Sequence, residues 1–85
     1  MIFWQEATAA RTSHVAYTQS DVLLARRHIL EGEARVSRQL LLMERMTAAG
    51  EPTAAAQALL SAFYETLEEM YLHLTAIQED LAARD

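Results

Sequence analysis

The chain has 85 residues, which is enough for one domain but leaves little room for a hydrophobic core. Hydrophobic residues make up 52% of the chain and there are only two glycines and one proline, a composition that favours long helices over short strands. Because the chain has no cysteine, neither a disulfide nor a thiolate metal site can stabilise it. A fold this small then needs efficient helix packing or oligomerisation.

The net charge of −5 argues against nucleic acid or an anionic membrane as the main partner. No run of apolar residues is long enough to cross a bilayer. Residues 1–6 lack the basic region and the sustained apolar region of a secretory signal. We therefore expect a cytoplasmic protein that uses neither a membrane nor nucleic acid.

The first predicted helix spans residues 18–49. Thr18 and Ser20 are both N-cap residue types, and Asp21 favours a first helical turn through its interaction with the helix dipole. Residues 1–17, which precede this helix, carry little pattern. We interpret them as an N-terminal arm or a short helix.

The second predicted helix spans residues 53–83 and follows a turn at residues 50–52. Gly50 can adopt the left-handed conformation of the C′ position that ends a helix. Pro52 is placed at the first helical position, where its missing N–H needs no partner.

A heptad repeat runs through the second helix. Leucines occupy every seventh position, at Leu60, Leu67, Leu74 and Leu81. Apolar side chains fill the intermediate positions, at Ala56, Phe63, Met70 and Ile77. The first helix has a weaker seam, made of Val22, Ala25, Ile29, Gly32, Val36, Gln39, Met43 and Met46. Two such seams predict an all-α fold, a long antiparallel two-helix hairpin with coiled-coil-like packing.

The register of this hairpin follows from a reversal of the chain at Gly50. Facing core residues should then have numbers that sum to about 99. This register puts Gly32 opposite Leu67 and Met43 opposite Ala56, so small side chains face large ones. It also explains a glycine in mid-helix, where it costs about 1 kcal/mol relative to alanine.

Two helices cannot cover all of the remaining apolar surface. One flank of the predicted hairpin gathers Leu23, Leu30, Leu40, Tyr64 and Tyr71. Arg26, Glu33 and Ser37 lie within the same stripe and can pair across an interface to fix its register. A stripe of this kind typically marks an interface. The simplest solution is a homodimer in which a second copy packs on this flank and forms a four-helix bundle.

An alternative cover for the stripe is the chain's own N-terminal segment. Its apolar tip consists of Ile2, Phe3 and Trp4. If residues 1–17 fold back, this tip can reach the hairpin and take the place of a second copy.

His28 and His73 are the candidates for a metal or ligand site. The register places them opposite each other on the other flank, with Glu31 and Glu69 nearby. Such a cluster can bind a transition metal or respond to pH. However, a carboxylate-bridged di-iron bundle needs Glu-x-x-His pairs directed into the core, and the chain has none. We interpret both histidines as partly exposed flank residues, and a metal- or ligand-binding bundle stays an alternative.

Arg27, Arg38 and Arg45 share an outer face of the first helix, a pattern that can contact phosphates. On an acidic molecule we expect this face to be solvated and to form local ion pairs. A nucleic-acid-associated regulator is therefore the second alternative. The second helix is strongly acidic, which suits a protein partner with an arginine-rich surface.

No catalytic constellation is recognisable in the sequence. There is no Gly-rich phosphate loop, nucleophile elbow or zincin motif, and the adjacent Glu68 and Glu69 point to different sides of a helix. We expect no enzyme and no cofactor. The leading hypothesis is a small helical interaction or structural protein that self-associates and presents its acidic second helix to a protein partner.

The stretch HILEGEARVSRQ at residues 28–39, the turn GEPT at residues 50–53 and the segment ALLSAFYETL at residues 58–67 carry a family resemblance. Together they resemble a group of small, uncharacterised bacterial helical-hairpin proteins, with a His-x-x-x-Gly-Glu helix, a short turn and a Leu-rich second helix. The likeness covers roughly residues 28–70. It implies the hairpin fold, and it assigns no catalytic or binding residue because the group has no known activity.

Overall fold

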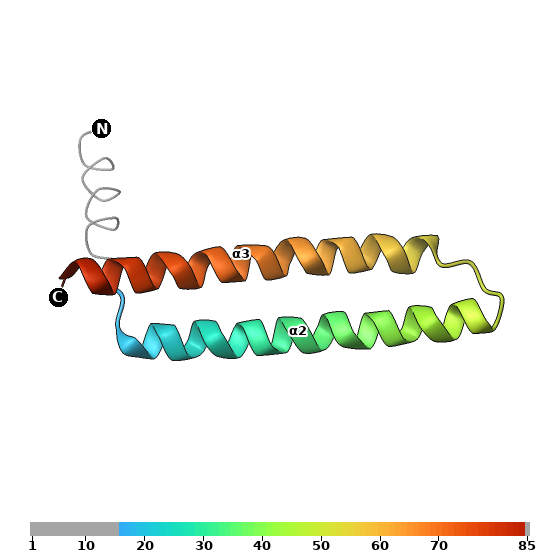
Figure 1. Ribbon diagram of the computed structural model, residues 1–85, viewed down its shortest axis with the longest axis horizontal. Helices are drawn as coiled ribbons and strands as arrows, with labels where there is room; N and C mark the ends of the chain where they lie inside the picture. The colour runs from blue at the N-terminus through green and yellow to red at the C-terminus, as the bar shows by residue number, and fades with distance from the viewer. Residues whose placement is uncertain (1–15, 85) are drawn as a thin grey trace, which may run out of the picture.

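The computed structural model describes residues 16–84 and contains two long helices (Figure 1). Helix α2 spans Gln19–Ala48 and helix α3 spans Ala54–Arg84. The chain reverses between them, so the two helices lie side by side and antiparallel along their whole length. The predicted all-α helical hairpin is confirmed. Residues 1–15, which include Ile2, Phe3 and Trp4, lie outside the described residues.

A capping residue sets the start of α2. Thr18 has an extended backbone, with φ −128° and ψ 174°, and its N–H donates a hydrogen bond of 2.8 Å to Oδ2 of Asp21. This bond from the third helical residue back to the N-cap is one half of a capping box. The helix therefore begins at Gln19, one residue after the predicted start.

The end of α2 is a Schellman motif built on Gly50. This glycine has φ +74°, a left-handed conformation that a residue with a β-carbon rarely adopts. Its N–H donates to the carbonyl of Thr47 at 3.0 Å, and the N–H of Glu51 donates to the carbonyl of Met46 at 2.9 Å. The role predicted for Gly50 is confirmed.

The start of α3 corrects the position assigned to Pro52. The helix begins at Ala54, so Pro52 lies before the cap and not at the first helical position. Thr53 takes the capping place, because its carbonyl accepts the N–H of Gln57 at 2.8 Å and its Oγ1 accepts Nε2 of Gln57 at 3.0 Å. A threonine hydroxyl can satisfy groups at a helix end, and a proline ring cannot.

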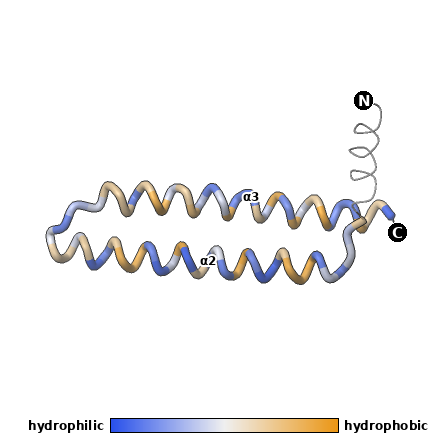
Figure 2. Tube along the Cα trace, turned by 180° about the vertical axis from the view of Figure 1, so that it is seen from behind, coloured by the Kyte–Doolittle hydropathy of each residue, from blue (hydrophilic) through white to orange (hydrophobic). Residues whose placement is uncertain are grey.

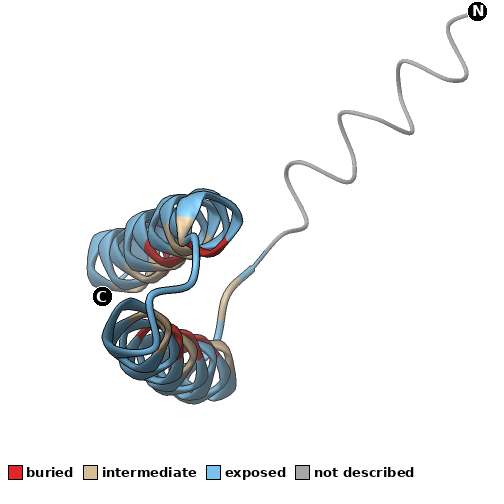
Figure 3. Ribbon diagram, turned by 90° about the vertical axis from the view of Figure 1, so that its right-hand side faces the viewer, coloured by how far each residue is buried: buried red, intermediate tan, exposed pale blue. Residues whose placement is uncertain are grey.

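The core lies between the two helices, along the predicted seams. Buried residues face the opposite helix when the hairpin is viewed from its end (Figure 3). On α2 the buried residues are Val22, Ala25, Ile29, Gly32, Val36 and Gln39. A β-carbon built on Gly32 would lie 3.1 Å from Cδ1 of Leu67. The predicted pairing of Gly32 with Leu67 is thereby confirmed.

The seam of α3 is less well covered than that of α2. Its buried members are Ala56, Leu67 and Ile77. Its half-buried members are Leu60, Phe63, Met70, Leu74 and Leu81. Large side chains on α3 extend beyond the small or medium-sized residues opposite them, so a single neighbouring helix cannot enclose them. Figure 2 shows hydrophobic positions recurring along the whole of both helices.

Gln39 is the one buried polar side chain in the described part of the chain. Its Nε2 donates a hydrogen bond of 2.9 Å to the carbonyl of Ala56. The sequence register put Met43 opposite Ala56, whereas the long amide of Gln39 reaches this alanine from one turn away. The hydrogen bond explains how a glutamine is accommodated in an apolar seam.

Tyr17 closes the open end of the hairpin. Its half-buried side chain packs against the cluster of Val22, Ala25 and Ile77. Its ring meets the ring of His73 edge-on, with centroids 5.9 Å apart. Its carbonyl accepts a hydrogen bond from Arg84. Tyr17 falls within the predicted N-terminal arm, residues 1–17, but its contacts belong to the hairpin.

Candidate functional site

The candidate interface is a flank of the hairpin that we call the Leu–Tyr flank, defined by Leu23, Leu30, Leu40, Tyr64 and Tyr71. All five side chains are exposed, from 43% for Tyr71 to 66% for Leu23 and Leu30. On α2 the three leucines lie beside the buried seam and not in it, because they follow the seam positions by one residue. Burial by a second copy stays a prediction.

A hydrogen bond between the helices crosses this flank. The hydroxyl of Tyr71 on α3 donates to a carboxylate oxygen of Glu33 on α2. The contact places Glu33 and Tyr71 on the same side of the hairpin, as the register predicts. It also raises the pKa of Tyr71 above its usual 10.0, first because the protonated phenol donates a hydrogen bond to Glu33 and then through partial desolvation and the negative charge of Glu33.

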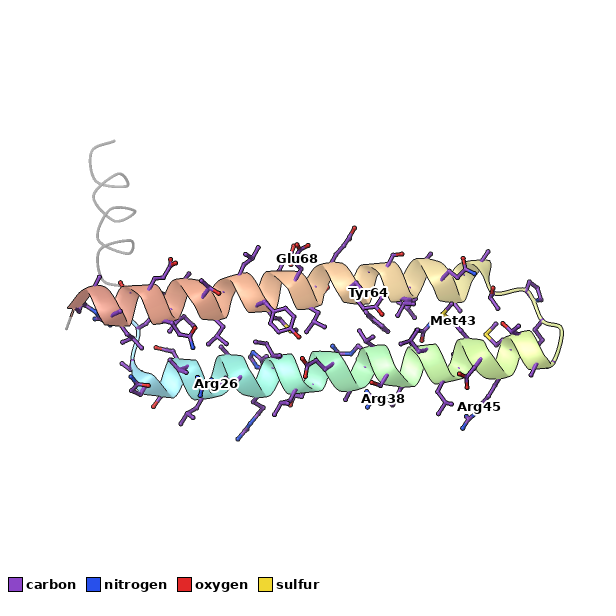
Figure 4. The ribbon with its side chains drawn as sticks, viewed as in Figure 1. Arg26, Arg38, Met43, Arg45, Tyr64 and Glu68 are labelled. Carbon is purple, nitrogen blue, oxygen red and sulfur yellow. The ribbon has the colours of Figure 1, made fainter. Side chains whose placement is uncertain are left out.

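Arg26 lies on α2 near the open end of the same flank (Figure 4). Within residues 16–84, no carboxylate lies within ion-pairing distance of its guanidinium group. It borders an open hollow of about 290 Å³ whose lining is mixed polar and apolar: Gln19, Val22, Arg26, Gln78, Leu81 and Ala82. Ser37, the remaining polar residue of the predicted stripe, is exposed. The flank therefore combines apolar side chains with an unpaired cation and a positioned anion.

Further exposed apolar residues were not predicted as part of a surface. These are Leu24, Leu41, Leu42, Leu59 and Leu72, with exposures between 45% and 64%. The run Leu40-Leu41-Leu42-Met43 could have revealed part of this surface, because successive residues of a helix are about 100° apart. Four consecutive apolar residues must therefore surround most of the helix, and one facing helix covers only one side.

The two histidines do not form a metal centre within the described residues. Both are exposed, and His73 packs against the ring of Tyr17. Across residues 16–84, no group of three His, Cys, Asp or Glu side chains is placed to hold a metal ion. Neither histidine has an observed contact that favours ligand binding.

The basic face of α2 differs from its prediction. Arg27, Arg38 and Arg45 are exposed, and Figure 4 shows Arg38 and Arg45 extending from the side of α2 that faces away from α3. The ion pair found in the described part of the chain is Asp80–Arg84, at 3.0 Å on α3. The prediction of local ion pairs on α2 is therefore wrong, since none forms on this helix. Exposed side chains that would each lose rotamer freedom gain little from such pairs.

Arg35 is a packing residue that was not predicted from the sequence. Its guanidinium carbon lies 5.8 Å from the centre of the Phe63 ring. A cation over an aromatic face is attracted by the ring quadrupole, and the arginine stem covers part of a half-buried phenylalanine. The seven-residue pattern gave a hint, since Arg35 directly precedes the seam residue Val36.

Comparison with known proteins adds no relative. No protein-family model matches the chain, and neither a curated protein nor a solved structure matches it. The resemblance of residues 28–70 to bacterial helical-hairpin proteins therefore stays a prediction. Neither helix of the described hairpin has the length and apolar character needed to cross a membrane.

Proposed function

We propose that this protein is a non-enzymatic helical interaction protein that self-associates through the Leu–Tyr flank to form a four-helix bundle. The supporting observation is the exposure of five large apolar or aromatic side chains on one side of a hairpin. Scattered exposed leucines are ordinary on protein surfaces, but several large apolar side chains gathered on one side, with polar residues among them, are typical of an interface.

The limited core of the hairpin gives a physical reason for association. Five seam residues of α3 are only half-buried, because one neighbouring helix cannot enclose them. Covering a half-exposed leucine contributes on the order of 1 kcal/mol. The proposed interface covers ten side chains of the Leu–Tyr flank, five from each copy. Their burial supplies several kcal/mol against the entropic cost of association. Since dimerisation favours the folded form, the hairpin should become more stable as protein concentration rises.

The flank is also suited to a second copy by its charges. Arg26 and Glu33 lie on the same side of α2 as Leu30, so the surface carries one cation and one anion. A surface that holds both signs can complement itself in a twofold pair, whereas a surface of one sign cannot.

The acidic outer side of α3 is the second part of the proposal. Away from the Leu–Tyr flank, α3 carries four acidic side chains, Glu65, Glu69, Glu79 and Asp80, against the single arginine Arg84. We propose that this side binds an arginine-rich surface of another protein. Such binding should weaken as salt concentration rises, because exposed charges are screened.

Sedimentation equilibrium over a series of protein concentrations tests self-association. The expected result is a dimer that dissociates on dilution. Leu30→Glu should yield a monomer, because it places a charge in the flank. Leu72→Glu is the matched control, since Leu72 is 64% exposed but lies on the outer side of α3, and it should leave the dimer intact. A wild-type chain that is monomeric at every concentration would refute the proposal.

A further inference from the structure

Arg26, Leu30 and Glu33 form one row on α2, with a positive charge at one end of the row and a negative charge at the other. The spacing of four and then three residues places all three on the same side of the helix. Arg26 precedes Leu30 by about 6 Å along the axis, and Glu33 follows it by about 4.5 Å. A cation and an anion therefore flank the leucine at nearly equal distances, one on each side.

The two charges differ in how they are held. Within residues 16–84 the guanidinium group of Arg26 has no carboxylate at ion-pairing distance. The carboxylate of Glu33 is fixed by the hydroxyl of Tyr71, and it keeps lone pairs free to accept further hydrogen bonds. The Glu33 carboxylate is thus already positioned in the single hairpin. The Arg26 guanidinium group has no ion-pair partner among residues 16–84.

Two twofold arrangements can bring the Leu–Tyr flanks of two copies together. In the first, both turns lie at the same end, and α2 of one copy packs on α3 of the other. Gly32 contacts Leu67 and Met70, so Glu33 and Glu68 lie at about the same height along the hairpin. Glu68 is one turn from both Tyr64 and Tyr71, on the same side of α3. This arrangement therefore brings Glu33 against Glu68 of the second copy, twice.

In the second arrangement the turns lie at opposite ends, and α2 packs against α2 of the second copy. Centring the twofold axis at Leu30 places this leucine, which is 66% exposed, against its own copy. Because Arg26 and Glu33 are almost equally far from Leu30, each Arg26 then meets Glu33 of the second copy. The twofold axis relates the two ion pairs, and each pair joins unlike charges. The hydroxyl of Tyr71 already holds the carboxylate of Glu33 in each copy.

We infer that the two copies pack with their turns at opposite ends, α2 against α2, about a twofold axis at Leu30 with reciprocal Arg26–Glu33 pairs. The inference rests on the proposed self-association and adds the orientation and register of the second copy. Electrostatic complementarity selects this arrangement, because the same-end alternative juxtaposes like charges and leaves Arg26 unpaired.

Cross-linking of single-cysteine variants tests the arrangement, and the chain is suited to it because it has no cysteine of its own. Under mild oxidation, Leu30→Cys should give a disulfide-linked dimer, since residue 30 lies at the axis and meets itself. Leu23→Cys and Leu40→Cys are matched controls on the same flank and should not link to themselves. In the same-end arrangement, Leu30→Cys would stay unlinked, and a mixture of Leu30→Cys with Tyr71→Cys would form the bond.

Charge reversal gives a second, independent measurement. Arg26→Glu and Glu33→Arg should each raise the dissociation constant of the dimer by roughly tenfold, because each creates two like-charge contacts. An equimolar mixture of the two variants should recover the wild-type value, since every contact in the mixed dimer again joins unlike charges. In the same-end arrangement, Glu33→Arg would tighten the dimer through Glu68 of the second copy.

The outcomes separate the inference from the proposed function. If the wild-type chain is a dimer but Leu30→Cys does not link and the mixed variants do not recover, the arrangement is wrong and self-association stands. If the wild-type chain is a monomer throughout, both fail. Linking of Leu30→Cys alone, together with recovery in the mixture, supports the arrangement.

Discussion

Gly32 of α2 lies against the end of the Leu67 side chain of α3, so that a β-carbon at residue 32 would sit 3.1 Å from Cδ1 of Leu67. It would also sit 3.2 Å from Sδ of Met70. Both neighbours are ends of flexible side chains, which can move by a few tenths of an ångström. The glycine therefore sets how closely the two helices approach at the middle of the hairpin, and the fit is tight enough to be tested by substitution.

Gly32→Leu should lower the free energy of unfolding by about 2 kcal/mol, because a large side chain at this position overpacks the seam. Gly32→Ala should be far milder, since one methyl meets only movable atoms and alanine has the better helix propensity. Urea unfolding followed by circular dichroism, at one protein concentration, measures both. Ala34→Leu on the exposed side of α2 is the control and should leave stability within about 0.5 kcal/mol of the parent.

Gln39→Ala should cost about 2 kcal/mol of stability, because it leaves a cavity in the seam and removes the hydrogen bond to the carbonyl of Ala56. Gln39→Leu should cost less than half as much, since it fills the same space and removes the buried polar group altogether. The same unfolding assay ranks the two variants. Equal losses for both would contradict the view that volume matters more than the hydrogen bond at this position.

Gly50→Ala should destabilise the hairpin by about 1 kcal/mol, because φ +74° is unfavourable for a residue with a β-carbon. The cause is conformational and not steric, since nothing lies within 4 Å of the added atom. Ala49→Gly is the matched control one residue earlier, where φ is −86°. If Gly50→Ala were neutral by thermal unfolding, the left-handed cap would not hold in solution.

The ionisation of Tyr71 should report the contact between the helices on the Leu–Tyr flank. Its pKa is raised above 10.0, mainly because the protonated phenol donates a hydrogen bond to Glu33. The folded form therefore holds this proton more tightly than the unfolded form, so the contribution to stability is complete below pH 10.0 and is lost as pH rises through the folded pKa.

Nuclear magnetic resonance of the labelled Tyr71 ring measures this pKa directly. Glu33→Ala should bring it back toward the usual value for tyrosine, because the acceptor and its charge are removed together. Glu68→Ala is the control, since Glu68 lies on the same flank but makes no hydrogen bond with Tyr71. An unchanged titration in Glu33→Ala would show that the contact is not formed in solution.

The helices and the core of this fold could be predicted because both are periodic. A heptad places side chains on one side of a helix, and so the buried positions of α2, from Val22 to Gln39, were all among the predicted seam residues. Gly50 was predictable for a local reason, since glycine is the residue that ends a helix in the left-handed conformation.

Contacts made by single residues outside this periodicity could not be predicted. Tyr17 precedes the first helix, and nothing in its neighbours indicates that it packs on Ile77 and His73. The reach of Gln39 to Ala56 depends on the length of one side chain across a helix offset of about one turn. The Leu–Tyr flank was inferred from the same register as the core, but what covers it depends on a second molecule, which the pattern within one chain does not contain.

The contact between Tyr17 and Arg84 has a mechanical consequence. The start of α2 and the end of α3 lie at the same end of the hairpin, opposite the turn (Figure 1). Tension applied between them pulls the helices apart sideways, starting at Tyr17 and moving inward one layer at a time, instead of sliding them past each other. Under load the hairpin should therefore open gradually at low force, and the contacts of the Tyr17 ring should break first.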